Sequence, residues 1–231
     1  MKSIFITGIS SGIGKGLALF YANKGVTVYG LSRRDLEYEH TNIKHLKLDI
    51  NNHTSYNNLN IFIDKTKFDL CILHAGVLGS MSSMKDVSID TLQTIMMTNT
   101  WSQKLIIDKL IEMKCSQTSI GISSGAAIKG TLGWAGYSIS KAALNMLIQL
   151  YASENPEIKI IALAPGLVDT SMQDYLCEKV DTDTFPTVNR LKEARGTSAM
   201  PTPEMFASNF DNKLNKVLSI ENGTFIDLRK I

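Results

Sequence analysis

Tyr137 and Lys141 are the residues of this chain whose types and spacing could perform acid–base chemistry. If a helix begins near Tyr137, the four-residue spacing places both side chains on one helical face. A neighbouring ammonium favours the phenolate and lowers the pKa of the tyrosine, so Tyr137 could act as a general acid or base. The same spacing occurs in many helices that perform no chemistry. Whether Tyr137 and Lys141 are catalytic therefore depends on which other residues the chain places beside them.

A glycine-rich turn near the N-terminus predicts a phosphate site. The apolar run 3–7 is followed by glycines and then by a helical pattern of apolar residues. Such a junction lets the backbone approach a phosphate closely and directs free N–H groups and the positive end of a helix at it. The spacing differs from the GxGxxG of the long-form dinucleotide fingerprint. Nucleotide binding is favoured over a plain tight turn, with contacts expected from Gly8, Ser10, Ser11, Gly12, Ile13 and Gly14.

The end of the second apolar run, 25–31, indicates which dinucleotide is bound. NAD-binding proteins tend to carry a carboxylate at the end of this strand for the ribose 2′-OH, whereas an arginine accommodates a 2′-phosphate. Here Ser32, Arg33 and Arg34 follow the run, and the first carboxylate is Asp35. The planar arginine head can donate two hydrogen bonds to a phosphate. The sequence therefore favours NADP(H) over NAD(H), the alternative being a solvated basic turn.

Apolar runs alternate with helical patterns along the whole chain. This alternation predicts a doubly wound, three-layer α/β Rossmann fold with a mostly parallel seven-stranded sheet, and ligands beyond the carboxyl ends of its strands. Helices are expected at 53–67, at 88–113, from Tyr137 onward and from Thr202 onward. The expected strands are 3–7, 25–31, 43–50, 69–74, 118–123, 159–163 and, at the edge, 224–228.

The segment 167–200 shows no regular period, and a long irregular stretch inside a compact domain is often a lid over a site. It mixes aromatic and Met side chains with basic ones, so it does not define a substrate class. With no linker or repeat in the sequence, residues 1–231 are expected to form a single dinucleotide-binding and catalytic domain that includes this lid.

Composition argues against several other classes. A net charge of +2 with dispersed basic residues predicts no nucleic-acid partner. Three separated cysteines and four scattered histidines show no ligand spacing, so no metal is expected and a reducing cytoplasm fits best. No apolar run reaches membrane-spanning length, and the first strand begins too early for a signal peptide, so secretion and membrane insertion are not expected.

Several motifs in the expected order resemble the short-chain dehydrogenase/reductase family over essentially the whole chain, in its single-domain, NADP-preferring, carbonyl-reductase-like branch. They are the glycine turn with Thr7, Asp49-Ile50, His74-Ala75-Gly76, Asn99, Ser123-Ser124, Tyr137-x-x-x-Lys141 and Pro165-Gly166-x-Val168-x-Thr170. The family usually has Asn where this chain has His74, which predicts a modified geometry at the cofactor rather than lost activity.

The resemblance implies a catalytic set in which Tyr137 exchanges a proton with a carbonyl or alcohol oxygen and Lys141 lowers its pKa and binds the nicotinamide ribose. Ser124 would orient the substrate oxygen, Ser123 would be structural, and Asn99 would hold a water of the proton relay. Substrate contacts are expected from Ser124, Trp134 and Tyr137. The resemblance also implies further cofactor contacts. Asp49 and Ile50 would contact the adenine, and Pro165, Gly166, Val168 and Thr170 would contact the nicotinamide. The remaining contacts are His74, Ala75, Gly76, Tyr137 and Lys141.

The sequence thus predicts an NADPH-dependent oxidoreductase that interconverts a small-molecule carbonyl and an alcohol. The alternative is a cofactor-binding sensor or scaffold that keeps the fold without turnover. By resemblance, a homodimer or homotetramer is expected through the long helices. The substrate and the physiological direction are left open.

Overall fold

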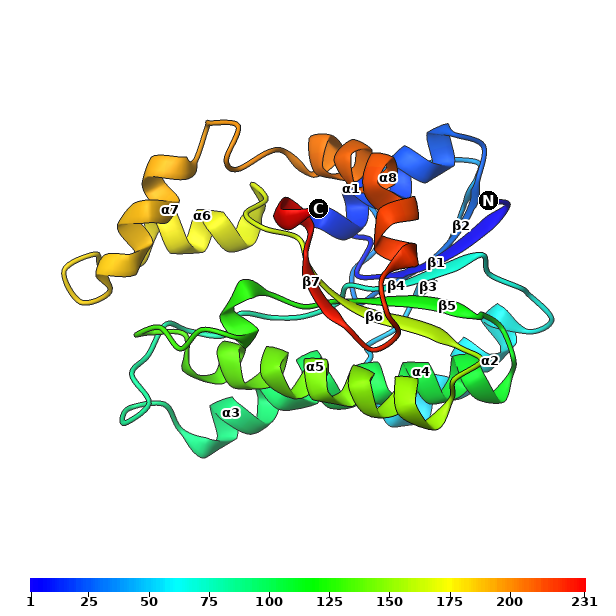
Figure 1. Ribbon diagram of the computed structural model, residues 1–231, viewed down its shortest axis with the longest axis horizontal. Helices are drawn as coiled ribbons and strands as arrows, with labels where there is room; N and C mark the ends of the chain where they lie inside the picture. Colours follow the sequence, from blue (N-terminus) through cyan, green and yellow to red (C-terminus); the bar gives the residue numbers. More distant parts are fainter.

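The computed structural model describes residues 1–231 as a seven-stranded sheet between two layers of helices (Figure 1). The strand order is β3-β2-β1-β4-β5-β6-β7, and every neighbouring pair is parallel. The predicted Rossmann fold is therefore confirmed. The strands are β1 (Ser3–Thr7), β2 (Thr27–Ser32), β3 (Ile43–Lys47), β4 (Leu70–Leu73), β5 (Thr118–Ile122), β6 (Lys159–Ala164) and β7 (Phe225–Asp227).

The central strands are apolar along their length because both faces of the sheet are covered. One face packs on α1 (Gly12–Asn23) and α8 (Pro203–Ser219), whose Leu17 and Phe210 are fully buried. The other face packs on α2 (Tyr56–Ile63), α4 (Ser102–Glu112) and α5 (Ala135–Glu154). Figure 1 shows these two layers above and below the sheet. The chain changes from one side to the other between β1 and β4, the position at which such sheets bind ligands.

The helix expected over 88–113 is not continuous. It consists of α3 (Ile89–Met96) and α4, joined by a π-helical turn at Met97–Trp101. A π turn contains one more residue than an α turn, and such turns often mark functional sites. The other helices differ less from the prediction. The helix α2 is shorter than the expected 53–67 and follows a 3-10 turn, and α5 begins two residues before Tyr137.

The segment 167–200 is more regular than its sequence suggested. It contains α6 (Ser171–Glu178), a 3-10 turn at Pro186–Val188 and α7 (Asn189–Ala194), and Figure 1 shows it projecting at the left, beyond the carboxyl ends of the strands. The expectation of an irregular stretch was wrong because these helices are too short to show a period. They pack around a small apolar cluster that also includes Leu78 from the loop after β4: Leu78, Leu176, Val180, Val188, Leu191 and Met200.

Arg195 ties this segment together through three carboxylates. Its guanidinium pairs with Asp169 at 3.2 Å, with Asp174, and with Glu178 at 3.2 Å. Asp169 precedes α6, and the other two carboxylates lie on it. A single side chain therefore joins the end of α7 to α6 and to the loop that leads back to β6.

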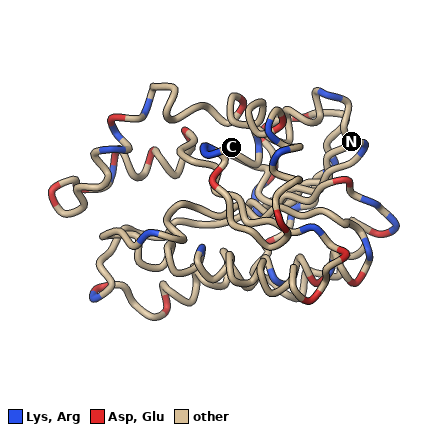
Figure 2. Tube along the Cα trace, viewed as in Figure 1, with Lys and Arg blue, Asp and Glu red and all other residues tan.

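Lys and Arg residues are interspersed with Asp and Glu residues along the chain in both helical layers, as Figure 2 shows. No His, Cys, Asp and Glu side chains gather in a group of three that could hold a metal ion. None of the helices combines the length and the apolar character that crossing a membrane requires.

Candidate active site

A cleft lies beyond the carboxyl ends of the central strands and has two continuous halves. One half is lined by Ser124, Trp134, Tyr137 and Lys141, together with the segment that begins at Pro165. The other half is lined by the ends of β2 and β4 and by residues that follow β3, including Asp49 and Ile50. Ser11, His74 and Gly76 line both halves. The topology therefore joins the residues suited to proton transfer with those suited to a nucleotide.

The glycine turn between β1 and α1 is packed too tightly for a side chain at Gly14. A Cβ added at Gly14 would lie 2.2 Å from the carbonyl oxygen of Gly8, which leaves no room for alanine. Gly8 and Gly12 also have positive φ angles of 81° and 56°, which favour glycine. At Gly12 the nearest group is Thr170 of the opposite wall, 3.2 Å from the added Cβ. Gly8 and Gly12 line the cleft, so the turn forms a cradle of backbone atoms in its wall.

His74 lies against this cradle. Its Nδ1 would be 2.9 Å from a Cβ added at either Gly8 or Gly14, and it has no hydrogen-bond partner. Burial, together with the nearby positive charge of Lys141, lowers the pKa of His74 from 6.5 to about 4. The imidazole is therefore neutral at physiological pH, and it occupies the junction of the two halves of the cleft.

Both arginines that follow β2 line the nucleotide half of the cleft. Arg34 donates a hydrogen bond of 2.9 Å to the Ser11 hydroxyl and a longer one of 3.4 Å to Ser10, so it connects the strand end with the glycine turn. Asp35, the first carboxylate after the strand, pairs instead with Lys47 at 2.6 Å. Both arginines therefore line this half of the cleft, and the nearby Asp35 carboxylate is paired with Lys47.

Tyr137 and Lys141 lie on one face of α5, as the spacing predicted, but their contact differs from the expected one. The Lys141 Nζ lies 5.9 Å from the centroid of the Tyr137 ring and donates a 2.7 Å hydrogen bond to the Ile122 carbonyl. Burial raises the pKa of Tyr137, while hydrogen bonding to Ser124 opposes that rise. The predicted lowering of the tyrosine pKa by Lys141 is therefore wrong in this structure, because the ammonium lies over the ring rather than beside the hydroxyl.

Lys141 itself is almost fully buried, and desolvation lowers its pKa from 10.5 to about 8. No carboxylate pairs with it. An ammonium held in the wall of a cleft without a negative partner suits a ligand that supplies hydroxyl oxygens or negative charge.

The two neighbouring serines after β5 have different surroundings. Ser124 lines the cleft, and its Oγ accepts a hydrogen bond of 3.1 Å from the Ala126 N–H. Ser123 donates a 2.5 Å hydrogen bond to Asn145 and is only 2% exposed. The structure thus places Ser124 toward a ligand and gives Ser123 a partner inside the protein. Asn145 was not singled out in the sequence because nothing in its spacing marks it.

Asn99 lies in the π turn, fully buried behind the cleft wall. Its amide accepts a 2.7 Å hydrogen bond from the Val77 N–H and donates one of 2.8 Å to the Val77 carbonyl. It also donates to Ser140 at 2.9 Å. The Asn99 amide therefore pairs with both the N–H and the carbonyl of Val77, in the way that a residue of an adjacent β-strand would. Gly76 separates it from the cleft, since an added Cβ there would meet Asn99 at 3.0 Å and Lys141 at 3.5 Å.

The wall opposite the nucleotide half is apolar. Trp134, Leu167 and Met172 line it, and the rings of Trp134 and Tyr137 lie 5.9 Å apart. None of the basic residues of the segment 167–200 lines this part of the cleft, whose only charged lining residue is Lys141. Leu167, Met172 and Gln173 were missed as lining residues, because a segment without a period gives no means of predicting which side chains face inward.

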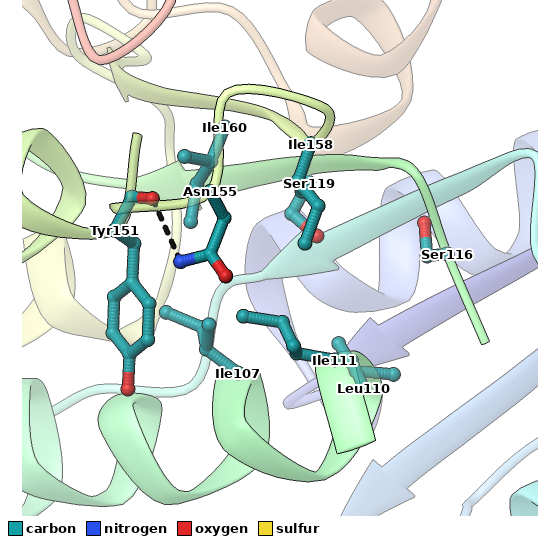
Figure 3. Close-up of a pocket in the computed structure, with 9 residues that line it drawn as sticks. All are labelled: Ile107, Leu110, Ile111, Ser116, Ser119, Tyr151, Asn155, Ile158 and Ile160. Carbon is teal, nitrogen blue, oxygen red and sulfur yellow. Dashed lines mark hydrogen bonds between the residues drawn. The ribbon is translucent and has the colours of Figure 1, made fainter. Parts of the chain in front are cut away.

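A smaller pocket lies at the other end of the sheet, between the C-terminal parts of α4 and α5 (Figure 3). It is lined mainly by isoleucine and leucine side chains, and Asn155 donates a 3.0 Å hydrogen bond to the Tyr151 carbonyl at its margin. It lies at the amino ends of β5 and β6. It contains no charged side chain and is separate from the cleft described above.

The family model for short chain dehydrogenase matches residues 2–181. The chain belongs to the short-chain dehydrogenase/reductase family. Its fold resembles the crystal structure of a short-chain dehydrogenase/reductase from Saccharomyces cerevisiae, with a TM-score of 0.85, 24% identity and coverage of 99% of this chain and 96% of the other.

Two curated relatives are reductases. A benzil reductase ((S)-benzoin forming) from Bacillus subtilis is 26% identical over all of this chain and 99% of its own length. An NADPH-dependent pterin aldehyde reductase from Arabidopsis thaliana is 28% identical over 74% of this chain and 76% of its own length. The chain is accordingly an oxidoreductase of the short-chain type that acts on carbonyl or alcohol groups.

Proposed function

We propose that this protein is an NADPH-dependent carbonyl reductase with Tyr137 as its proton donor. The observation that carries the proposal is the single cleft in which Ser124, Tyr137 and Lys141 occupy one half and Arg33 and Arg34 the other. A sensor or scaffold that only binds the cofactor would not need the first group of residues.

The cleft fits a phosphorylated dinucleotide. Residues of the glycine turn and the first residues of α1 line the cleft, where free backbone N–H groups and the positive end of the helix suit a phosphate. Arg33 and Arg34 would hold a 2′-phosphate, and the pairing of Asp35 with Lys47 removes the carboxylate that a ribose 2′-OH would favour. The bound nicotinamide would supply the hydride, and the protein supplies orientation and a proton.

The proton step follows from the surroundings of Tyr137. Its raised pKa keeps the phenol protonated at neutral pH, which is the state required of a donor. Ser124 would hold the carbonyl oxygen beside it by donating a hydrogen bond. As negative charge develops on that oxygen, the phenolic proton moves to it, and the positive charge of Lys141 stabilises the phenolate that remains. In the reverse direction the same groups would remove a proton from an alcohol.

The substrate class that fits best is a neutral carbonyl compound with an aromatic substituent. The substrate side of the cleft offers Trp134, Leu167 and Met172 for apolar contact, and no charged group except Lys141. The names of the relatives, benzil reductase and pterin aldehyde reductase, refer to aromatic carbonyl substrates. No arginine or lysine of the segment 167–200 lines this half of the cleft, so an anionic ketone would have no basic side chain of the lid to bind its charge.

The activity test is NADPH consumption with a panel containing benzil, an aromatic aldehyde, an aliphatic aldehyde and an anionic keto acid. We expect turnover of the aromatic members and a loss of about 100-fold or more in kcat for Tyr137→Phe, which removes only the hydroxyl. NADPH should still bind to this variant, with an affinity reduced by no more than the cofactor contact expected of the Tyr137 hydroxyl. Tight NADPH binding by the wild type without turnover of any carbonyl would instead support the sensor or scaffold.

The cofactor preference is tested separately by titration. Arg34→Ala is expected to weaken NADPH binding about tenfold or more while leaving NADH binding nearly unchanged, because NADH lacks the 2′-phosphate. Arg33→Ala is measured alongside it to apportion the effect between the two guanidinium groups. A wild type that binds NADH more tightly than NADPH would refute the preference.

We also propose that copies of the chain assemble through α4 and α5. Trp101, Ile139, Met146 and Leu150 lie in the π turn and on α5 and are 45–54% exposed, an apolar surface that a second copy would cover. The cysteines are all unpaired, which suits a reducing cytoplasm. A monomer in analytical ultracentrifugation would reject the assembly.

A further inference from the structure

His45 is a polar side chain on the edge strand of the sheet that the reaction described above does not use. It lies on β3 and pairs in register with Gly30 on β2, so its side chain shares a face with that of Ser32, two residues further along β2. The His45 Nε2 lies 2.7 Å from the Ser32 Oγ. Ser32 in turn lines the nucleotide half of the cleft, together with Arg33 and Arg34. The imidazole is therefore one hydrogen bond away from a residue of this half.

The hydrogen bonds of Ser32 determine which atom of the Ser32–His45 pair is the donor. The Ser32 hydroxyl donates its single proton to the Arg34 carbonyl at 2.7 Å, and a carbonyl oxygen can only accept. The His45 Nε2 must therefore carry a proton and donate it to the Ser32 Oγ. A second proton can then add only at Nδ1, so this hydrogen bond is present with both the neutral and the charged imidazole. Protonation of His45 therefore adds charge beside Ser32 without removing the contact.

This arrangement leaves Ser32 able to bind a phosphate. Because His45 holds the Ser32 Oγ, the hydroxyl proton can turn from the Arg34 carbonyl to a phosphate oxygen while the bond from His45 is kept. Two hydrogen bonds of about 2.7 Å in series place such an oxygen within about 6 Å of the His45 Nε2. A negative charge at that distance favours the imidazolium. A 2′-phosphate would therefore raise the pKa of His45, whereas the 2′-OH of NAD(H) would not.

The charged groups around His45 do not already supply this negative charge. Burial lowers the pKa of His45 below its ordinary value of 6.5, the Asp35 carboxylate opposes this shift, and the Lys47 ammonium adds to it. Asp35 and Lys47 form an ion pair with each other at 2.6 Å, so their effects on His45 largely cancel. Arg33 and Arg34, in the loop between β2 and β3, are further positive charges that a bound phosphate would neutralise.

We propose that His45 is a specificity-determining residue that acts through Ser32 and makes the preference for NADP(H) over NAD(H) increase as the pH falls. It holds the Ser32 hydroxyl in place for the 2′-phosphate, and its second proton adds a positive charge beside that hydroxyl. His45 lines neither half of the cleft, so it is a positioning residue. The inference rests on the proposed binding of NADP(H) and does not depend on the carbonyl substrate.

The direction of the pH dependence follows from linkage. Binding of the 2′-phosphate is accompanied by proton uptake at His45, because the pKa of the imidazole is higher in the complex than in the free protein. The added affinity is complete below the pKa of the free protein and is lost as the pH rises through the higher pKa of the complex. A shift of about one pKa unit, which a charge within about 6 Å can produce, corresponds to about tenfold in affinity.

The test is calorimetric titration of NADP⁺ and NAD⁺ at about pH 5.5 and about pH 8.5. The oxidised cofactors are used because the reduced ones decompose in acid. His45→Gln keeps an N–H donor for Ser32 but cannot be protonated. The 2′-phosphate itself titrates with a pKa of about 6, and this effect cancels because it is common to both proteins. We expect lowering the pH to raise the NADP⁺-to-NAD⁺ affinity ratio about three- to tenfold more in the wild type than in His45→Gln.

Two further variants complete the design. His40→Gln is the matched control, because His40 is another imidazole of the same loop, lies 3.2 Å from the Asn23 side-chain oxygen and lines neither half of the cleft. It should keep the wild-type response to pH. His45→Leu removes both the donor and the charge, so at about pH 8.5 its affinity ratio should fall about threefold, whereas His45→Gln should keep most of the wild-type ratio. Thermal unfolding checks each fold, and His45→Gln decides alone if His45→Leu does not fold.

Three results would overturn the inference. An equal response to pH in the wild type and His45→Gln would show that the charge of His45 does not act on the phosphate, and loss of the response in His40→Gln would assign it elsewhere. A wild-type ratio in folded His45→Leu at the higher pH would show that Ser32 needs no support from His45. A wild type that prefers NAD⁺ at both pH values, or binds neither cofactor, would instead refute the proposed function, so the two failures are distinguishable.

Discussion

Replacing His74 by Asn, the residue usual in this family, is expected to reduce the acid sensitivity of the fold. The pKa of His74 is lowered to about 4 in the folded protein, against an ordinary value of 6.5. Between these values the unfolded chain binds a proton that the folded chain does not. The stability associated with a neutral His74 is therefore complete above about pH 6.5 and is lost as the pH falls toward 4.

The size of the effect follows from the difference between the two pKa values. A difference of about 2.5 pKa units corresponds to about 3 kcal/mol, most of which is lost by about pH 4.5. Although Nδ1 is buried, the residue as a whole keeps partial exposure at the cleft, which reduces the penalty on its charged form. We therefore expect His74 to account for about 2 kcal/mol of the stability that the wild type loses between about pH 7.5 and pH 4.5.

Urea unfolding of wild type and His74→Asn at these two pH values measures this quantity. The comparison is the change in unfolding free energy between the two pH values, so a constant effect of the substitution cancels. His53→Asn, on an exposed surface turn, is the matched control and should behave as the wild type does. Equal losses for wild type and His74→Asn would refute the assignment of a neutral, buried imidazole to this position.

Two further substitutions test the cradle and the lid. Gly14→Ala should lower the unfolding free energy by about 3 kcal/mol and abolish NADPH binding, because its Cβ would collide with the Gly8 carbonyl. Gly130→Ala is the control, because a Cβ at Gly130 has no atom within 4 Å, and it should have neither effect. Calorimetry measures the unfolding and the NADPH binding of both variants. Arg195→Ala should speed limited proteolysis within 171–195 and raise KM, because α6 and α7 lose their shared ion pairs. Unchanged cleavage would show that the apolar cluster alone holds the lid.

The strands were largely predictable from the sequence because a parallel sheet covered on both faces requires continuous apolar runs. The run at Ser3–Thr7 and the edge strand near Phe225–Asp227 are examples. The site was predictable to the extent that it lies on motifs at strand ends. The glycine turn, Ser124 and Tyr137 meet because parallel strands end at the same edge of the sheet.

The features that were not predictable depend on packing between distant segments. Lys141 lies over the ring of Tyr137 because the Ile122 carbonyl holds its ammonium, and helical spacing contains no information about that partner. The π turn was hidden because apolar residues continue on both sides of it.

The π turn at Met97–Trp101 also sets how much change in length this part of the chain can tolerate. Because this wider turn accommodates one extra residue, removing a residue from it would restore a regular helix and leave α3 and α4 in nearly the same relative rotation. Ile106 and Leu110 would stay in the core, but Asn99 would lose the turn that directs it at the Val77 backbone. The packing of α4 should therefore survive a one-residue deletion here better than the contacts of Asn99.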